Sequence, residues 1–135
     1  MGVRRGCTLT LDQRSSRTSQ DLVPQLLRVL SELPVLSVDE AGEVLAASGP
    51  PCWDLAPERT AGDEVQGFTS DPATMVAAVW AACGQGLWWC GVGLGEVVTP
   101  LPGSTREATG SAYIAARDAV TSAKGALDGL STRIS

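Results

Sequence analysis

Two acidic positions are the strongest candidates for chemistry in this sequence. Asp12 follows an alternating apolar and polar stretch, 7–11, that predicts a strand, and Asp63-Glu64 fall in the turn of a hairpin predicted over 52–69. If the first strand is central and lies beside that hairpin, these carboxylates can meet at one end of the sheet. Converging carboxylates suit Mg²⁺, which takes oxygen ligands and completes its shell with water and phosphate. Such a site could activate a hydroxyl and neutralise a leaving pyrophosphate.

A simpler interpretation of the same acids stays open. Asp12 would then only end a strand in a turn, and Asp63-Glu64 would only decorate a hairpin. Since acidic residues are common in turns, the spacing alone favours this simpler interpretation.

The composition excludes several classes of enzyme. The chain has no histidine, which removes histidine general bases, Ser/His/Asp and Cys/His nucleophiles, and histidine-ligated zinc. The four cysteines show no CxxC spacing, so no zinc knuckle or thioredoxin-like site is indicated, and they are best explained as buried thiols in a reducing cytoplasm. The net charge of -5 argues against nucleic acid as a main partner.

The length and hydrophobic content indicate a single globular domain. The chain has 135 residues, 44% of them hydrophobic, with a core expected over about 7–125 and a frayed tail over 126–135. Residues 75–95 carry no charge and are long enough to cross a bilayer. However, the Gly84-Gln85-Gly86 turn separates an alanine-rich half from a Trp- and Val-bearing half, which favours a helix, a turn and a buried strand. We therefore expect no membrane partner.

The remaining pattern predicts an alternating order of elements. A helix begins near Asp21 and ends at Pro34, while 35–51 is ambiguous between a short strand and a turn or two of helix over 40–47. Further elements are a helix over 72–83, a strand over 87–94 and a helix over 111–124. The order strand, helix, hairpin, helix, strand, helix predicts an α+β, ferredoxin-like antiparallel sheet with the helices on one face.

The four tryptophans, Trp53, Trp80, Trp88 and Trp89, are expected to fill the core. Trp88 and Trp89 are adjacent and must point to opposite faces of a strand. One of them therefore faces the helices, and the other faces the open side of the sheet or a partner. Because an exposed Trp would mark an interface, we hold a homodimer as a hypothesis.

Several segments resemble nucleotidyl cyclases. Arg-Thr-Ala-Gly-Asp-Glu-Val at 59–65 resembles the hairpin of class III nucleotidyl cyclases and the GGDEF hairpin of diguanylate cyclases. Gly-Leu-Gly-Glu-Val-Val at 93–98 and Gly-Ser-Ala-Tyr-Ile-Ala-Ala-Arg at 110–117 resemble later cyclase segments. Three segments in this order, 11–17, 58–67 and 109–124, together are most similar to the SatD family, which has the same palm-like, nucleotidyl-cyclase-like fold. The similar segments cover most of 7–125.

This resemblance implies roles for individual residues. Asp12 and Asp63 match the two metal-binding acids of the cyclase fold. Glu64 matches the second acid of the GGDEF turn, which makes Asp63 and Glu64 candidates both for catalysis and for Mg²⁺ binding. Arg117 matches the arginine that stabilises phosphate charge in the transition state. Arg59 falls where cyclases keep a lysine that recognises the base, so its guanidinium could contact a nucleobase or a phosphate.

Three further residues are candidate nucleotide contacts. Tyr113 falls where adenylyl cyclases keep an asparagine that, like the arginine, helps to stabilise phosphate charge in the transition state. This departure from the cyclase pattern bears on whether the chain is catalytically active. Arg14 and Arg17 could hold a phosphate, although a solvated loop is favoured by the usual distribution of arginine on surfaces.

Two functional hypotheses follow from the resemblance and the residues together. The first is a SatD-like cytoplasmic domain that binds Mg²⁺ and a nucleoside triphosphate and, if it turns over, catalyses nucleotidyl transfer or cyclisation. The alternative is a catalytically degenerate cyclase-fold module that regulates or binds another protein. Class III cyclases work as dimers with the site between subunits, which gives the homodimer a second motive.

Overall fold

The structure is a computed structural model that describes residues 2–14, 20–38, 41, 43–47, 49–84, 86–125 and 132–134. In chain order the elements are β1 (Gly2–Gln13), α1 (Val23–Ser31), β2 (Leu36–Val38), β3 (Val44–Ala47), β4 (Leu55–Ala61), β5 (Glu64–Thr69), α2 (Pro72–Cys83), β6 (Trp88–Thr99), the 3₁₀ helix η1 (Thr105–Glu107), α3 (Ser111–Lys124) and β7 (Thr132–Ile134).

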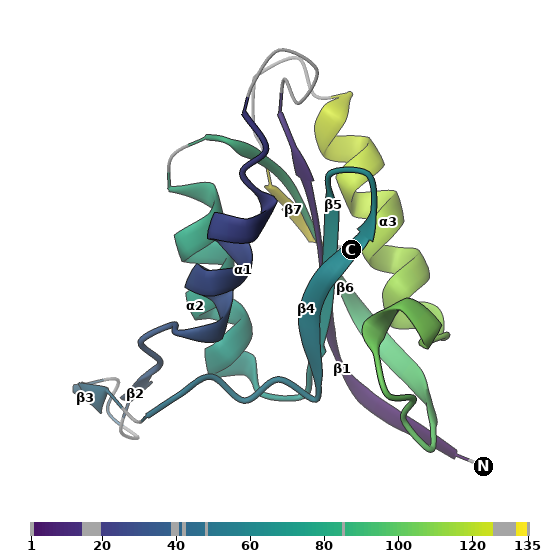
Figure 1. The fold of residues 1–135 in the computed structure, drawn as a ribbon. Coiled ribbons are helices and arrows are strands. Elements are labelled where there is room, and N and C mark those ends of the chain that lie inside the picture. The colour runs from purple at the N-terminus through teal and green to yellow at the C-terminus, as the bar shows by residue number, and fades with distance from the viewer. Residues whose placement is uncertain are drawn as a thin grey trace.

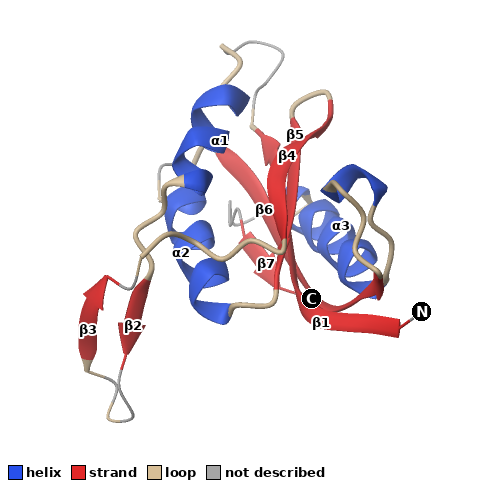
Figure 2. Ribbon diagram, turned by 60° about the horizontal axis from the view of Figure 1, so that its bottom comes forward, coloured by secondary structure: helices blue, strands red, loops and turns tan. Residues whose placement is uncertain are grey.

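Five strands form the main sheet in the order β4-β5-β1-β6-β7, and β2 and β3 form a separate hairpin (Figure 2). The central strand β1 runs antiparallel to both β5 and β6, and β4 runs antiparallel to β5. These four strands, joined through α1 and α2, have the ferredoxin-like order. The α+β class and the antiparallel sheet predicted from the sequence are thus confirmed.

The helices lie on both faces of this sheet, which corrects the prediction of one covered face. Figure 1 shows α1 and α2 on one side and α3 on the other. The reason lies in β6, where Gly91, Gly93 and Gly95 line the face toward α3. A Cβ on Gly93 would lie 2.2 Å from the backbone oxygen of Ala112, so only glycine lets α3 approach this closely.

Local sequence signals explain most element boundaries. The helices α2 and α3 have the predicted ends, and the Asp71 carboxylate caps α2 by accepting hydrogen bonds from the backbone N–H groups of Ala73 and Thr74, both at 3.3 Å. The predicted hairpin is β4 and β5, with a turn that places Gly62 at φ +54°.

Several boundaries differ from the prediction. The first strand, predicted over 7–11, spans Gly2–Gln13 because it pairs along its whole length with β6, and α1 spans Val23–Ser31 and ends before Pro34. The strand predicted over 87–94, β6, continues to Thr99 because it pairs along the full length of β1. Within the ambiguous segment, Val44–Ala47 form the strand β3 and not a helical turn. At the C-terminus, Thr132–Ile134 pair in parallel with β6 as β7, so the expected frayed tail is wrong for these three residues, while 126–131 lie outside the described residues.

The main hydrophobic core lies between the sheet and α1 and α2. Trp88 is buried there, and Trp53 is half-buried, with its indole N–H donating to the Leu30 carbonyl at 2.9 Å. Trp80 is 83% exposed, so the prediction that all four tryptophans fill the core is wrong at this position. In the part of the chain that the structure describes, no helix is long and apolar enough to cross a membrane.

Candidate functional site

Three side chains lie in a row across the sheet on the face toward α3. The register pairs Asp12 of β1 with Glu64 of β5 on one side and with Trp89 of β6 on the other. Asp63 follows Gly62 in the hairpin turn, beside the end of this row. Neighbouring strands place paired residues on the same face, so the row is a direct consequence of the register.

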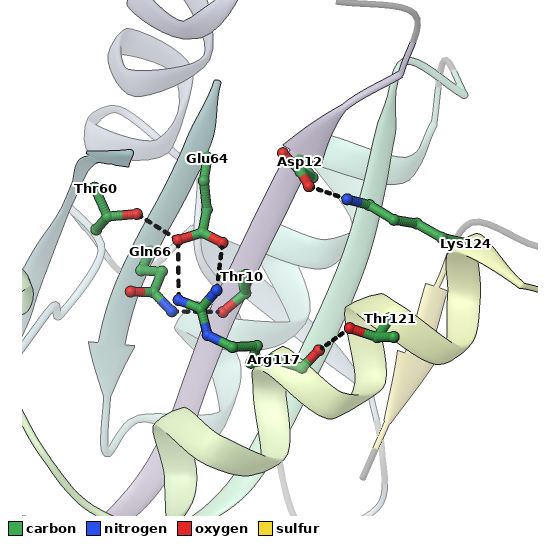
Figure 3. Close-up of polar contacts among 8 residues, drawn as sticks. All are labelled: Thr10, Asp12, Thr60, Glu64, Gln66, Arg117, Thr121 and Lys124. Atoms are coloured by element: carbon green, nitrogen blue, oxygen red, sulfur yellow. Dashed lines mark hydrogen bonds and ion pairs between the residues drawn. The ribbon is translucent and has the colours of Figure 1, made fainter. Parts of the chain in front are cut away.

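The carboxyl groups of Asp12 and Asp63 meet, as the sequence predicted. Asp12 is half-buried, and burial raises the pKa of its carboxyl. The neighbouring Asp63 carboxyl, which shares a hydrogen bond with it, raises this pKa further, while Lys124 lowers it. The Lys124 ammonium donates to Asp12 Oδ2 from the last turn of α3 (Figure 3). The acid pair is therefore partly neutralised by a cation that the fold itself supplies.

Glu64 is held by a second cation of the same helix. Its two carboxylate oxygens accept hydrogen bonds from Arg117 Nη1 and Nη2, both at 3.2 Å (Figure 3). Thr60 Oγ1 donates a third hydrogen bond to Glu64 at 2.7 Å. The Glu64 side chain is 12% exposed and the Arg117 side chain 59%. The structure thus brings Arg117 to the acids, as predicted, with the Glu64 carboxylate already occupied.

The spacing of α3 explains why both cations reach the acids. Arg117 and Lys124 are seven residues, or about two helical turns, apart, so they lie on the same side of the helix. Below them, Gln66 Nε2 donates to Thr10 Oγ1 at 3.1 Å, and both side chains are buried. This hydrogen bond closes the bottom of the site (Figure 3).

The structure does not bring Arg59 to this cluster. Its guanidinium donates to the Gly62 carbonyl at 2.6 Å and to Asp21 Oδ2 at 2.7 Å, in the loop before α1. Arg59 thereby lowers the pKa of the Asp21 carboxyl. Its visible role is to join the hairpin turn to the start of α1, and not to line the acid pair.

Arg14 lies beside the row, where its guanidinium carbon stacks 4.2 Å above the centre of the Trp89 ring. Trp89 points to the face opposite Trp88, as predicted, but that face is covered by α3 and is not an open sheet surface. Arg17 lies outside the described residues.

Tyr113 lies in a second, smaller core and not with the acids. It packs with Phe68, with ring centres 6.4 Å apart, and its hydroxyl shares a hydrogen bond with Thr105 Oγ1. Burial, opposed by the Thr105 hydrogen bond and assisted by the nearby charge of Glu58, raises the pKa of Tyr113 to about 12. The phenol therefore stays protonated at neutral pH, and its side chain supports the packing of α3.

Sequence reasoning missed Lys124, Thr60 and Trp89 as members of this site. One signal for Lys124 was available in the sequence, because it is the one lysine of the chain. Its position two turns after Arg117 was a second signal. Thr60 and Trp89 could be identified only from the strand register, which sequence spacing does not define.

The donor set fits a Mg²⁺ ion bound by two carboxylates, Asp12 and Asp63, where Lys124 now supplies the positive charge. The site does not offer Glu64 as a third carboxylate, as the prediction of Asp12, Asp63 and Glu64 required, because the Glu64 carboxylate is paired with Arg117. Among the described residues, no group of three or more His, Cys, Asp or Glu side chains is arranged to hold a metal ion. Mg²⁺ usually takes one or two protein carboxylates and completes its shell with phosphate and water, so two are sufficient.

Comparison of the chain with protein-family models, with curated proteins and with solved structures found no match. The similarity to the SatD family therefore stays a prediction based on the segments quoted above.

Proposed function

We propose that this chain binds a nucleoside triphosphate together with Mg²⁺ and transfers or cyclises its nucleotidyl group. The observation that carries the proposal is the meeting of the Asp12 and Asp63 carboxyls beneath two cations of α3. Two adjacent carboxylates bind a hard divalent cation, and two nearby cationic side chains suit the phosphates that accompany it. No histidine is needed for this chemistry.

Each residue would have a distinct part in such a site. Asp12 and Asp63 would hold Mg²⁺, which when bound would neutralise triphosphate charge and make a coordinated hydroxyl more acidic. Arg117 is exposed on its outer side and would stabilise charge on the transferred phosphate, while Glu64 fixes the direction of its guanidinium. Trp89 ends the row, and the guanidinium of Arg14 stacked on its ring presents a planar surface for a base.

Lys124 would have two positions in this proposal. Without ligand, its ammonium lies on Asp12 and supplies the charge that a metal ion would supply. With a metal ion on the carboxylates, Lys124 would be displaced, and its long, 44% exposed side chain could turn to a phosphate oxygen. Lys124 is then a competitor of the metal ion in one state and a nucleotide contact in the other.

The second candidate function is a non-catalytic regulatory or interaction module. The observation that favours it is that Tyr113, at the position where cyclases keep an assisting asparagine, is buried with its hydroxyl on Thr105. Glu64 is also fully engaged by Arg117 and Thr60. Under both candidates we propose a cytoplasmic protein that forms a homodimer.

Thermal unfolding with a panel of nucleoside triphosphates, each with and without Mg²⁺, tests the first candidate. Ligand at about 100 times its Kd raises the free energy of unfolding by roughly 2.7 kcal/mol, which is a shift of several degrees. We expect this shift to need Mg²⁺, to vanish in Asp63→Asn and to persist in the control Asp118→Asn, which changes an exposed carboxyl elsewhere on α3.

Lys124→Met sharpens the same experiment, because it removes the competing cation and keeps both acids. We expect it to raise the affinity for Mn²⁺ or Mg²⁺ alone, measured by calorimetry. A shift that is equal in Asp63→Asn, or no shift with any triphosphate, would contradict the proposed function. Nucleotide binding without release of pyrophosphate or a cyclic product would favour the second candidate.

A further inference from the structure

A short segment before α1, residues 20–22, links the end of β1 to the hairpin turn between β4 and β5. On β1 the residue after Asp12 is Gln13, which is buried and uses both ends of its amide on this segment. Its Nε2 donates to the Gln20 carbonyl at 2.7 Å, and its Oε1 accepts from the backbone N–H of Leu22 at 3.0 Å. Two backbone groups of the segment are thereby tied to the end of β1.

The middle residue of the segment, Asp21, is held from the side of the hairpin. Arg59 of β4 donates through Nη2 to Asp21 Oδ2 at 2.7 Å and through Nη1 to the Gly62 carbonyl at 2.6 Å. The other carboxylate oxygen of Asp21 accepts from the backbone N–H of Val23, the first residue of α1, at 3.1 Å. One guanidinium therefore fixes both the segment and the residue directly before Asp63.

The contacts of this segment lie on strands that are not neighbours. Since β5 lies between β1 and β4, the segment is attached on both sides of β5. Gln13 pairs with Trp88 in the sheet, and Arg59 pairs with Val65. Because Trp88 and Val65 belong to the core beneath α1 and α2, both contacts lie on that face. The hairpin is therefore held on one face by residues 20–22 and on the other by the contacts of α3 to Glu64.

We propose that Gln13 and Arg59 are positioning residues for the metal site. By clamping the end of β1 and the hairpin turn to residues 20–22, they hold the carboxyls of Asp12 and Asp63 at the separation that one divalent cation requires. These roles rest on the proposed function, since the Mg²⁺ ion at the acid pair belongs to that proposal. Removal of such outer partners typically lowers metal affinity by about 10–100-fold. This role of Arg59 differs from the base recognition that the cyclase resemblance implied.

The charge of Arg59 distinguishes positioning from two simpler roles. As a cation beside the hairpin turn, Arg59 repels a divalent ion, so electrostatics alone predicts tighter metal binding when this charge is removed. A residue that recognises only the nucleobase predicts no change in the affinity for a metal ion alone. Positioning predicts weaker metal binding, because the loss of Arg59 releases the turn that carries Asp63.

Calorimetric titration of the full chain with Mn²⁺ alone tests these roles. We expect Arg59→Gln to weaken Mn²⁺ binding by about tenfold or more, and Gln13→Met, which changes no charge, to weaken it in the same direction. The control is Arg4→Gln, which breaks the Arg4–Asp54 ion pair near the other end of β1. The Arg4 side chain is 48% exposed and that of Arg59 39%, so the two changes are matched, yet Arg4→Gln should leave the Mn²⁺ affinity unchanged. Circular dichroism checks that each variant is folded.

Amide hydrogen exchange of the ligand-free protein tests the clamp without a metal ion. If residues 20–22 join the end of β1 to the hairpin turn, each substitution should be felt at the other attachment. Gln13→Met should therefore speed exchange in the hairpin turn, and Arg59→Gln should speed exchange at the end of β1. Arg4→Gln should do neither.

Mn²⁺ binding that is unchanged or tighter in Arg59→Gln would overturn its positioning role. Exchange that changes only in the substituted strand would overturn the clamp. Since Gln13 is buried, Arg59→Gln decides both points if Gln13→Met does not fold. A wild type that binds no metal ion would contradict the proposed function instead, and the exchange measurement would still decide whether residues 20–22 join the two attachments.

Discussion

The two faces of the central sheet are built from different side chains. The face toward α1 and α2 is lined by large, buried apolar residues of β1 and β6: Leu9, Leu11, Trp88, Cys90 and Val92. With Trp89 and Val97 as the large exceptions, the face toward α3 is lined by smaller or polar residues of the same strands: Thr8, Thr10, Asp12, Gly91, Gly93 and Gly95. The first face buries apolar area, and the second brings a helix backbone close enough to hold Arg117 and Lys124 over the acids.

This difference separates stability from chemistry within one sheet. Apolar burial is the main favourable contribution to folding, and it is concentrated on the α1 and α2 face. The α3 face carries two of the titratable groups whose pKa values depart from their usual range, Asp12 and Tyr113, while the Cys7 thiol, whose pKa is raised by burial, packs against the core on the other face. Substitutions on the first face should therefore lower stability and leave the acid site intact, while those on the second should affect the site.

Leu11→Ala should have the largest effect on stability. Leu11 is fully buried, so the change leaves a cavity and should lower the free energy of unfolding by about 2–5 kcal/mol. Denaturant unfolding measures this loss. If the folded variant still binds Mg²⁺ and nucleotide with wild-type affinity at low temperature, the separation of the two faces holds. A parallel loss of affinity in the folded variant would contradict it.

Gly93→Ala should have the next largest effect, and it should weaken both stability and nucleotide binding. Its Cβ would lie 2.2 Å from the Ala112 oxygen and 2.3 Å from the Ala116 nitrogen, so α3 must move outward. Overpacking of this kind costs about 1–3 kcal/mol. Because α3 carries Arg117 and Lys124, we also expect weaker nucleotide binding. Gly103→Ala is the control, since nothing lies within 4 Å of its added Cβ. Unchanged stability in Gly93→Ala would refute the close approach.

The same glycines show how far the sequence predicted this fold. The Asp71-Pro72 start of α2 and the strict alternation of β1 are local signals, and they led to correct elements. The face of the sheet on which α3 packs is determined by tertiary contacts. The sequence indicated this face only through a glycine at every second residue over 91–95. Trp80 was assigned to the core because α2 is apolar on all sides, a pattern that hydrophobicity alone cannot distinguish from a buried helix.

The candidate site was predicted in part for the same reason. The meeting of Asp12 and Asp63 follows from strand order and a hairpin turn, which the sequence indicated well. Glu64 was assigned from its place in the hairpin turn and Arg117 by resemblance, but their ion pair depends on where α3 crosses the sheet. Arg59 was misplaced because its neighbour Asp21 comes from a distant loop, and no pattern in the sequence connects them.

Asp12→Asn should change the free energy of unfolding by less than Leu11→Ala or Gly93→Ala, and should raise it. The folded pKa of Asp12 is raised, so between its ordinary value and the raised value the native state holds a proton that the unfolded state has released. The free energy of unfolding of the wild type therefore falls as pH rises through this window, and the loss persists above it. Asp12→Asn removes this loss and should be the more stable protein at neutral pH.

Thermal unfolding from acid to neutral pH measures the difference between Asp12→Asn and the wild type. The stability gap should be absent below the ordinary carboxyl pKa, open through the window and stay constant above it. Lys124 loses its partner in the variant, but it is 44% exposed and remains solvated, so this loss should be small. Asp118→Asn should show no such gap. A variant less stable than the wild type at neutral pH would mean that the Lys124 pair outweighs the cost of burial.

Arg117→Ala should have the smallest effect on stability and a large effect on the affinity for a nucleoside triphosphate. Its pair with Glu64 is bidentate, yet the Arg117 side chain is 59% exposed, so a double-mutant cycle with Glu64→Gln should give only about 0.2–1 kcal/mol. Salt should reduce this coupling.

If Arg117 contacts a phosphate, its loss should weaken triphosphate binding, measured by calorimetry, far more than it changes the free energy of unfolding. This is the reverse of the result expected for Leu11→Ala. Equal binding by Arg117→Ala and the wild type would show that α3 contributes only a surface ion pair, and the chemical character of its face would then depend on Asp12 and Asp63 alone.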